Sequence, residues 1–339
     1  MSTFVHLHNR SDYSLLRSLT SVESLVDRAA RLGMPAVALT DENVLSGALH
    51  FYNRCAGTLS ASGEPIKPII GCDLGMDTSW LGSRQPAADR DCGGRIVLIA
   101  LNSDGIAQLI QLSSQTCRNG RDRPIPLTRT VLEKHADNLL LLTGGINGVL
   151  SGCLGSGMPA AAHTFLEWAK TVYGTDDVFV ELVRDGNSRR DLAGDGLAEL
   201  ARTHALNTVA TNDTFYPMTE DARAHEVLEC VRESKSYEDP DHPRLPSDEL
   251  SIKSAEQMIE LFSDVPEAVE NTVRIAAMID PDWKLPGPIF PRPELPEAYS
   301  DSRDYLRDSV LAGLQERYGD VGPEVRERAE MELQYIIST

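Results

Sequence analysis

The sequence predicts an α/β protein whose strands close, or nearly close, into a barrel. About seven strand–helix units follow one another over roughly the first 210 residues, which is more than one open sheet usually carries. Short apolar runs predict the strands, and the segments between them have the apolar spacing of helices. At 339 residues, with 41% hydrophobic and 24% charged side chains, the chain can form a large domain with or without an appendage.

The first predicted strand is Phe4-Val5-His6-Leu7-His8. His6 and His8 are two residues apart, so their side chains are expected on the same side of the strand. Two imidazoles in this arrangement are typical of metal ligands. Arg10 continues the same face, and a guanidinium cannot ligate a metal ion and would repel one. The strand therefore carries two possible metal ligands, His6 and His8, next to the cation Arg10, which would repel a metal ion.

The next segments predict a strand–helix–strand order typical of a parallel sheet. A helix is expected from Ser21, which can cap its start, to Gly33, which can end it. Its apolar stripe consists of Leu25, Ala29 and Leu32. A strand at residues 36–40, a helix at 46–54 and a strand at 67–73 follow.

The alternation continues after a polar loop at residues 78–94. Strands are expected at residues 95–100, 139–143, 178–183 and 207–210, with helices at 103–116 and 160–173 and another that ends near His204. Barrels of this kind carry their functional residues at the carboxyl ends of the strands. The residues expected there are His6, His8, Asp41, Glu42, Asp73, Gly145 and Asp213. Imidazoles and carboxylates from several strands thus meet at one rim, as a metal site requires.

The character of the chain changes from about residue 219. Amphipathic helices are expected at residues 221–233, 254–262 and 266–278, and two more at 301–318 and 323–337. Six prolines between residues 281 and 296 predict an extended connector. We therefore expect one domain at residues 1–280 and a second part at 281–339. The sequence stops within an apolar helical run, which is expected of a segment of a longer protein.

The charge of the chain limits its partners. The net charge is −19, from 51 acidic residues against 32 lysines and arginines, so direct DNA binding is not expected. Six cysteines without CxxC spacing indicate reduced thiols and a cytoplasmic location. No segment approaches the ~18 consecutive apolar residues of a membrane span, so no membrane association is expected.

Several motifs resemble one known family. They are Phe4–His8, Ser11–Leu16, Leu39–Asp41, Lys67–Cys72, Ala210–Asp213, Ala224–Leu228, Lys253–Ser254, Leu261–Ala268 and Gly313–Tyr318. In order and spacing they resemble the amino-terminal PHP (polymerase and histidinol phosphatase) domain of bacterial DNA polymerase III alpha subunits. The resemblance implies a distorted (β/α)7 barrel, followed by the first helices of the polymerase palm. It also implies that the catalytic carboxylates of this DNA-directed DNA polymerase, a nucleotidyltransferase, lie outside these residues.

The resemblance further implies a metal-ligand pattern that this chain keeps only in part. The ligand positions that remain are His6, His8, Glu42, Asp73 and Asp213, whereas the chain departs from the pattern at Arg10, Arg95, Gly145 and Phe215. A multi-metal phosphoesterase needs several ligands for each ion and an open position for water. We therefore expect a degenerate site with no catalytic residue and no cofactor, and at most one residual Zn, Mn or Mg ion. The two arginines are expected to pair with Asp73, Asp213 or Glu42.

Four functions fit these expectations. The first is a non-catalytic module that supports the remainder of the alpha subunit and docks a proofreading exonuclease. The second is an active metal-dependent 3′–5′ proofreading exonuclease, and the third is a free-standing phosphoesterase similar to the histidinol-phosphate branch. The fourth is the PHP module of an error-prone paralogue, which Thr40-Asp41-Glu42 would suit.

Overall fold

The computed structural model describes residues 3–82, 94–117, 124–185, 188–244, 247–283, 291 and 293–338, without the side chains of 188–194. The chain divides into two compact units, Met1–Lys284 and Leu285–Thr339, and each is described by itself. Residues 284–290 and 292 of the expected proline-rich connector fall outside the described residues. No helix in the described ranges has both the length and the apolar character needed to cross a membrane.

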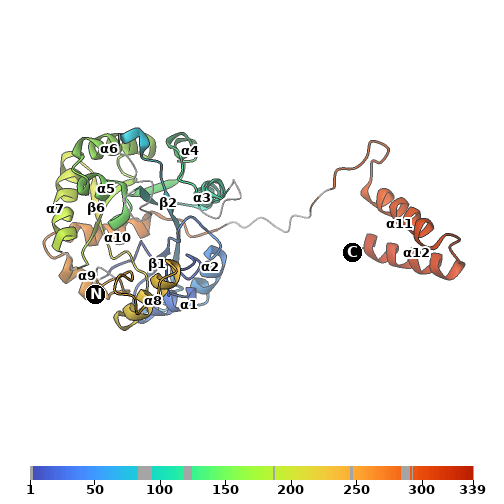
Figure 1. Cartoon of the computed structure of the whole chain (residues 1–339), viewed down its shortest axis with the longest axis horizontal. Helices are drawn as coiled ribbons and strands as arrows, with labels where there is room; N and C mark the ends of the chain where they lie inside the picture. Colours follow the sequence, from blue (N-terminus) through green and yellow to red (C-terminus); the bar gives the residue numbers. More distant parts are fainter. Residues whose placement is uncertain are drawn as a thin grey trace. The chain divides into compact units, whose positions relative to one another are not determined.

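The first unit is built on a six-stranded sheet (Figure 1). Its strands are β1 (Ala36–Leu39), β2 (Lys67–Gly75), β3 (Arg95–Ala100), β4 (Leu139–Leu142), β5 (Val178–Val183) and β6 (Asn207–Thr211), which are hydrogen-bonded in chain order. The predicted α/β, TIM-like fold is confirmed. All six strands lie close to their expected positions, because each is an apolar run between turn-forming residues.

The amino-terminal segment joins the two edges of this sheet. On one side the Ala38 N–H donates to the His6 carbonyl at 2.9 Å, and on the other the Thr214 N–H donates to the His8 carbonyl at 3.1 Å. The prediction of a regular strand here is wrong, because side-chain hydroxyls interrupt the ladder. Thr272 Oγ1 accepts the Val5 N–H at 3.2 Å, and Thr40 Oγ1 accepts the Asn9 N–H at 2.9 Å.

Strand β3 runs antiparallel to both β2 and β4, which corrects the prediction of parallel neighbours. Parallel neighbours need a long crossover, usually helical. The described part of the β2–β3 connection holds only a short 3-10 turn, η1 (Ser79–Leu81). The reversal places Arg95, the first residue of β3, opposite Gly75 at the carboxyl end of β2. Arg95 consequently lies at the same rim as the ends of the parallel strands.

Helices surround the outside of the sheet (Figure 1). They are α1 (Val22–Arg31), α2 (Ala48–Ala56), α3 (Ser103–Thr116), α4 (Arg129–Lys134), α5 (Val149–Gly155), α6 (Pro159–Tyr173) and α7 (Ser188–Thr203). As expected, Ser21 caps α1, accepting the Ser24 N–H at 3.1 Å, and Gly33 follows its end with a φ of 72°. One face of the sheet buries apolar side chains against these helices.

The opposite face of the sheet encloses a second apolar cluster, which includes Ile69, Leu140 and Phe179. Helix α10 (Pro266–Met278) closes this cluster at the end where the strands begin. There the amide of Asn271 donates to the carbonyl of Thr208, in the first half of β6, at 2.8 Å. The other end, where β1, β2, β5 and β6 finish, is the functional rim expected from the sequence.

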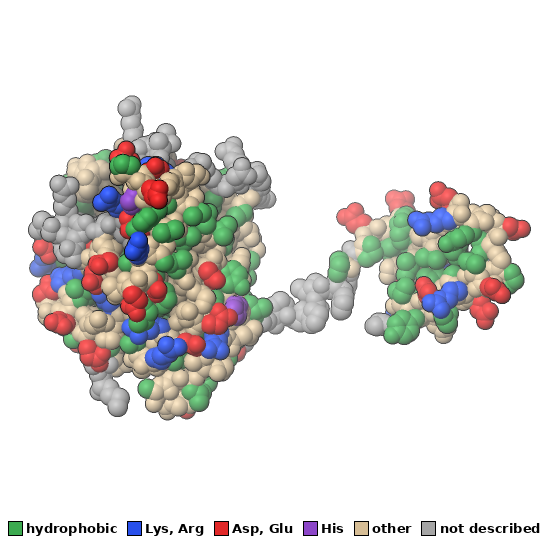
Figure 2. Space-filling view, turned by 60° about the horizontal axis from the view of Figure 1, so that its bottom comes forward, with side chains coloured by type: hydrophobic (Ala, Val, Ile, Leu, Met, Phe, Trp, Pro, Cys, Tyr) green, Lys and Arg blue, Asp and Glu red, His purple; other side chains and the backbone are tan. Residues whose placement is uncertain are grey.

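The remaining helices also match the predicted segments. In the first unit they are α8 (Ala222–Arg232) and α9 (Ala255–Leu261), and in the second unit α11 (Ser302–Tyr318) and α12 (Pro323–Ser338). Ser254 caps α9 through a reciprocal pair of hydrogen bonds with Gln257. Arg307 of α11 donates two hydrogen bonds to Glu330 of α12, at 2.7 and 2.6 Å. Figure 2 shows acidic and basic side chains intermixed over one face of the first unit.

Replacing Gly105 with alanine is expected to lower the free energy of unfolding by about 1–3 kcal/mol. A Cβ at this position of α3 would lie 2.2 Å from the carbonyl oxygen of Asn138 and 3.2 Å from Ala100 Cα. Urea denaturation measures the loss. Gly155→Ala in α5 is the matched control, because nothing lies within 4 Å of its added Cβ and alanine favours a helix. Equal effects of the two substitutions would contradict the close approach at Gly105.

Candidate functional site

The candidate site is a cluster of buried charges at the strand-end rim, which we call the rim network. It contains Arg10, Arg95 and His8 as nitrogen-bearing groups and Asp73, Asp213, Glu42 and Glu181 as carboxylates. The amino-terminal segment supplies two of these residues, and β2, β3, β5 and the ends of β1 and β6 supply the others. Four of the five residues predicted as remnant metal ligands therefore lie together.

Arg10 lies at the centre of the network, with no exposure to solvent. Its Nη2 is 2.5 Å from Asp73 Oδ2, its Nη1 donates to Asp213 Oδ1, and its Nε lies 3.0 Å from Glu42 Oε1. The guanidinium also lies 4.4 Å from the centre of the Phe215 ring. Burial alone would lower the pKa of Arg10, but the three carboxylates raise it above its ordinary value. The guanidinium is thus a permanent cation among them.

Asp73 is held between two arginines. Arg95 Nε lies 2.7 Å from Asp73 Oδ1, and Arg95 Nη2 donates to the Asp73 carbonyl at 2.7 Å. Burial would raise the pKa of Asp73, but Arg95 and Arg10 together hold it well below its usual range. The expectation that Arg10 and Arg95 pair with Asp73, Asp213 or Glu42 is confirmed by these contacts.

His8 is enclosed by carboxylates. Its Nδ1 lies 2.7 Å from Glu181 Oε1, and its Nε2 lies 3.4 Å from both Asp73 Oδ2 and Asp213 Oδ1. Burial lowers the pKa of His8, but Glu181 and Asp213 outweigh it and raise the pKa to about 10. A protonated ring donates from both nitrogens, which suits the carboxylates on its two sides.

Glu181 is the functional residue that sequence reasoning missed. It lies in β5 with 1% exposure, and it accepts a hydrogen bond from Thr211 Oγ1 at 2.5 Å. The available signal was a single acid inside the apolar run Val178–Val183. A buried carboxylate in such a strand requires a partner. Gly145 lies beside it, since a Cβ there would come within 3.2 Å of Glu181 Oε1.

The charges of the rim network balance without an added ion. Arg10, Arg95 and protonated His8 face four carboxylates, and Arg17 Nε lies 3.3 Å from Glu42 Oε2 as a fourth positive group. Within the part of the chain that is described, no group of three or more His, Cys, Asp or Glu side chains is arranged to hold a metal ion. The Arg10 guanidinium lies between Asp73, Asp213 and Glu42.

Comparison with known proteins identifies the family. The model of the PHP domain family matches residues 6–185, which is more than half of the chain. The chain belongs to the PHP domain family. The matched range contains the whole rim network except Asp213, and the resemblance to the PHP domain of bacterial DNA polymerase III alpha subunits is confirmed.

The similar curated proteins are DNA polymerase III alpha subunits. That of Treponema pallidum is 35% identical over 338 residues, which are 99% of this chain and 28% of the relative. That of Borreliella burgdorferi is 33% identical over 339 residues, 99% of this chain and 29% of the relative. That of Escherichia coli K12 is 32% identical over 333 residues, 98% of this chain and 27% of the relative. This chain therefore spans less than a third of the length of these relatives.

His6 is separate from the rim network of this PHP domain. Its Nε2 lies 2.9 Å from the carbonyl oxygen of Lys253, and the ring is fully buried. Burial, with the nearby charges of Lys253 and Arg28, lowers the pKa of His6 to about 4. Its predicted place among the remnant ligands is not supported by any contact with them in the described structure. The ligand role of the other four residues stays a prediction.

Acidification is expected to destabilise the PHP domain through His6. The pKa of His6 falls from 6.5, its ordinary value, to about 4 in the folded chain, so the unfolded chain binds the proton more tightly. Stability that is present above pH 6.5 is then lost as the pH falls toward about 4, by up to about 3 kcal/mol. Urea denaturation of the wild type and His6→Gln across this range isolates the effect, since other groups titrate in both. A constant difference between them would contradict it.

Asp41 has a structural role beside the rim network. It accepts hydrogen bonds from the Ser11 N–H at 2.7 Å, from Ser11 Oγ at 2.8 Å and from Ser14 Oγ at 2.6 Å. These contacts fix the turn that follows the amino-terminal segment. The carboxylate oxygens of Asp41 are therefore used as hydrogen-bond acceptors for this turn.

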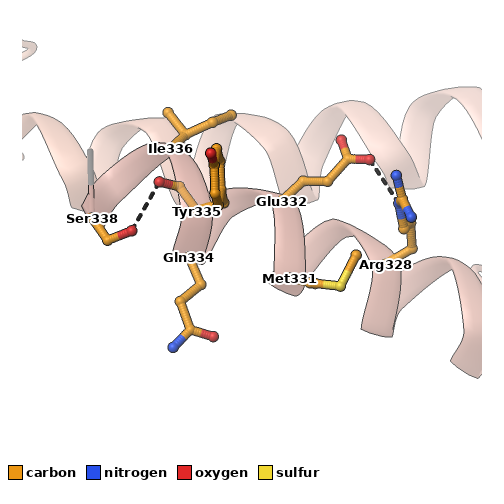
Figure 3. Close-up of a pocket in the computed structure, with 7 residues that line it drawn as sticks. All are labelled: Arg328, Met331, Glu332, Gln334, Tyr335, Ile336 and Ser338. Atoms are coloured by element: carbon orange, nitrogen blue, oxygen red, sulfur yellow. Dashed lines mark hydrogen bonds and ion pairs between the residues drawn. The ribbon is translucent and has the colours of Figure 1, made fainter.

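A separate hollow of about 680 Å³ lies along α12 in the second unit (Figure 3). Its lining residues are Arg328, Met331, Glu332, Gln334, Tyr335, Ile336 and Ser338. The one acid among them, Glu332, is paired with Arg328 at 2.7 Å. In Figure 2 the visible face of the second unit shows hydrophobic and basic side chains, with acidic side chains mostly around its edge. The hollow offers an apolar surface and none of the paired carboxylates of a hydrolytic site.

Proposed function

We propose that this chain is the PHP module of a replicative DNA polymerase III alpha subunit and that its rim is not catalytic. Its role is to support the remainder of the subunit and to provide a docking face for a proofreading exonuclease. The names and the 32–35% identity of the relatives support the first part. The helices α11 and α12 then belong to the start of the palm.

The position of Arg10 carries the proposal of an inactive rim. A hydrolytic PHP site needs metal ions with several ligands each and an open position for water. Here a buried guanidinium bonds to Asp73 and Asp213 and lies beside Glu42. At about 4 Å and an effective dielectric constant of about 20, a unit charge repels each charge of an incoming ion by about 4 kcal/mol. Arg95 adds a second such charge.

The partners follow from the same assignment. The remainder of the alpha subunit is the first partner, and a proofreading exonuclease subunit is the second. The net charge of −19 disfavours direct contact with DNA, so the nucleic acid is held by other parts of the polymerase. A replication protein of this kind works in the cytoplasm.

The test combines metal analysis with a nuclease assay. The 339-residue chain is purified without chelator, its metal content is measured, and it is incubated with labelled single-stranded DNA and Mn²⁺ or Zn²⁺. We expect no cleavage above that of the His8→Ala variant. Cleavage from the 3′ end that is lost in His8→Ala would overturn the proposal of an inactive rim.

One observation favours a second candidate, a metal-dependent 3′–5′ exonuclease with a reduced site. Among the described residues, Glu181 Oε2 and Asp213 Oδ2 are buried without a hydrogen-bond partner, on either side of His8. A carboxylate oxygen without a partner is a possible ligand for a residual Zn, Mn or Mg ion. Two or more tightly bound ions for each chain in the metal analysis would support this candidate. A third candidate is the PHP module of an error-prone paralogue. The sequence of the complete gene product distinguishes such a paralogue from a replicative subunit.

A further inference from the structure

Two histidines outside the rim network face each other on the surface of the first unit. His163 lies on the exposed side of α6, and His204 follows the end of α7. His163 Nδ1 and His204 Nε2 are 2.7 Å apart, and the ring centres are 4.9 Å apart with the planes inclined at 35°. Both side chains thus direct a ring nitrogen at the same point.

A carboxylate fixes the orientation of His204. Glu167, one turn after His163 on α6, lies with its Oε1 2.9 Å from His204 Nδ1. An ionised carboxylate only accepts hydrogen bonds, so Nδ1 carries the hydrogen and the lone pair of His204 is on Nε2. Lys170 Nζ contacts the same Glu167 oxygen at 2.7 Å, so the two side chains offset one another in charge.

The tautomer and the burial of His204 suit a metal ligand. Its side chain is only 6% exposed, and its contact with Glu167 leaves Nε2 free to face His163. A neutral imidazole is the form that binds transition metals. The Glu167–His204 pair reproduces the carboxylate–histidine pairing that orients metal-bound imidazoles in many proteins.

We propose that His163 and His204 form a surface site for a divalent transition-metal ion such as Zn²⁺, oriented by Glu167. The ion takes the position of the hydrogen that the two nitrogens share. Zn–N bonds of 2.0–2.1 Å at a tetrahedral angle separate two nitrogens by about 3.3 Å. The pair therefore has to open by only about 0.6 Å, which the exposed His163 side chain allows. Water completes the coordination on the solvent side.

Calorimetric titration of the 339-residue chain with Zn²⁺ in a non-chelating buffer near neutral pH tests this site. The wild type is expected to bind one equivalent that is lost in His163→Ala, an exposed substitution with little risk to folding. Glu167→Ala is expected to keep the site with an affinity about 10–100-fold lower, because His204 loses its orienting partner. His50→Ala is the matched control, since His50 Nε2 also pairs with a carboxylate, Glu23 Oε1 at 3.0 Å, but faces no second histidine in that contact.

Each outcome decides the proposal. Loss of one equivalent in His163→Ala and an unchanged titration in His50→Ala support the site. The same number of bound ions with the same affinity in His163→Ala, or no Zn²⁺ binding by the wild type, overturns it. An affinity of Glu167→Ala equal to that of the wild type overturns the orienting role of the carboxylate. The rim network does not enter these comparisons, because it is identical in every variant.

Discussion

Replacing Arg10 with methionine is expected to lower the free energy of unfolding by about 3–5 kcal/mol. The substitution keeps most of the side-chain volume but leaves Asp73, Asp213 and Glu42 without the cation they share. Arg95 still pairs with Asp73, whereas Asp213 keeps only His8 as a charged partner in the rim network. Buried carboxylates that lose a partner cost far more than a lost surface contact. Urea denaturation at neutral pH measures the effect.

Two variants give this measurement its controls. Arg54→Ala removes an ion pair with Asp27 whose side chains are 38% and 32% exposed, and it is expected to cost less than about 1 kcal/mol. Arg10→Lys keeps the charge but loses the planar fork that reaches several carboxylates, so its stability should lie between wild type and Arg10→Met. An Arg10→Met variant as stable as Arg54→Ala would refute the importance of the central guanidinium.

The double substitution Arg10→His with Phe215→His is expected to make the stability of the domain depend on divalent metal ions. The two wild-type side chains contact each other, with the guanidinium 4.4 Å from the ring centre, so the pair is best changed together. The change removes the central cation and supplies two imidazoles beside Asp73 and Asp213. At a free ion concentration of 100 times the dissociation constant, bound Mn²⁺ or Zn²⁺ would raise the free energy of unfolding by about 2.7 kcal/mol.

This experiment is best made in a His163→Ala background, so that an ion at the surface histidine pair does not contribute. Phe215→His alone keeps Arg10 and should gain no metal dependence, and the parent with both native residues should gain none. If the double variant binds no more metal than its parent, the rim has diverged too far in shape for two side chains to restore a site. A gain in the single variant would instead show that Arg10 does not exclude the ion.

Local sequence signals predicted most of the fold because the physics behind them is local. Ser21 and Ser254 each cap a helix by accepting a hydrogen bond from its first turn, which is a local contact. An apolar run such as Leu139–Leu142 forms a strand whether that strand is parallel or antiparallel to its neighbours. That symmetry is why the reversal of β3 escaped prediction: a run of apolar residues does not reveal which way its strand points. The connection that sets the direction contains no α-helix in its described part, only the short 3-10 turn η1.

The candidate site was predictable where strand ends placed residues at a common rim. Arg10 and Asp213 are 203 positions apart, yet both follow strand-like segments that finish on the same side of the barrel. Glu181 was not predicted as a site residue, because its burial depends on the neighbouring strands β4 and β6. His6 was grouped with His8 by its spacing and by the resemblance, whereas Lys253, 247 positions later, provides its actual partner.

The amino-terminal segment has a consequence for how the protein is made. Residues 4–10 cover the backbone groups at both edges of the sheet, and uncovered edges are templates for aggregation. These residues are synthesised about 200 positions before Thr214, which the segment needs before it can be held on both sides. At about 5–20 residues per second this wait is roughly 10 to 40 s. During synthesis the sheet edges of this domain are consequently exposed to edge-to-edge association until the segment at residues 4–10 can bind Thr214.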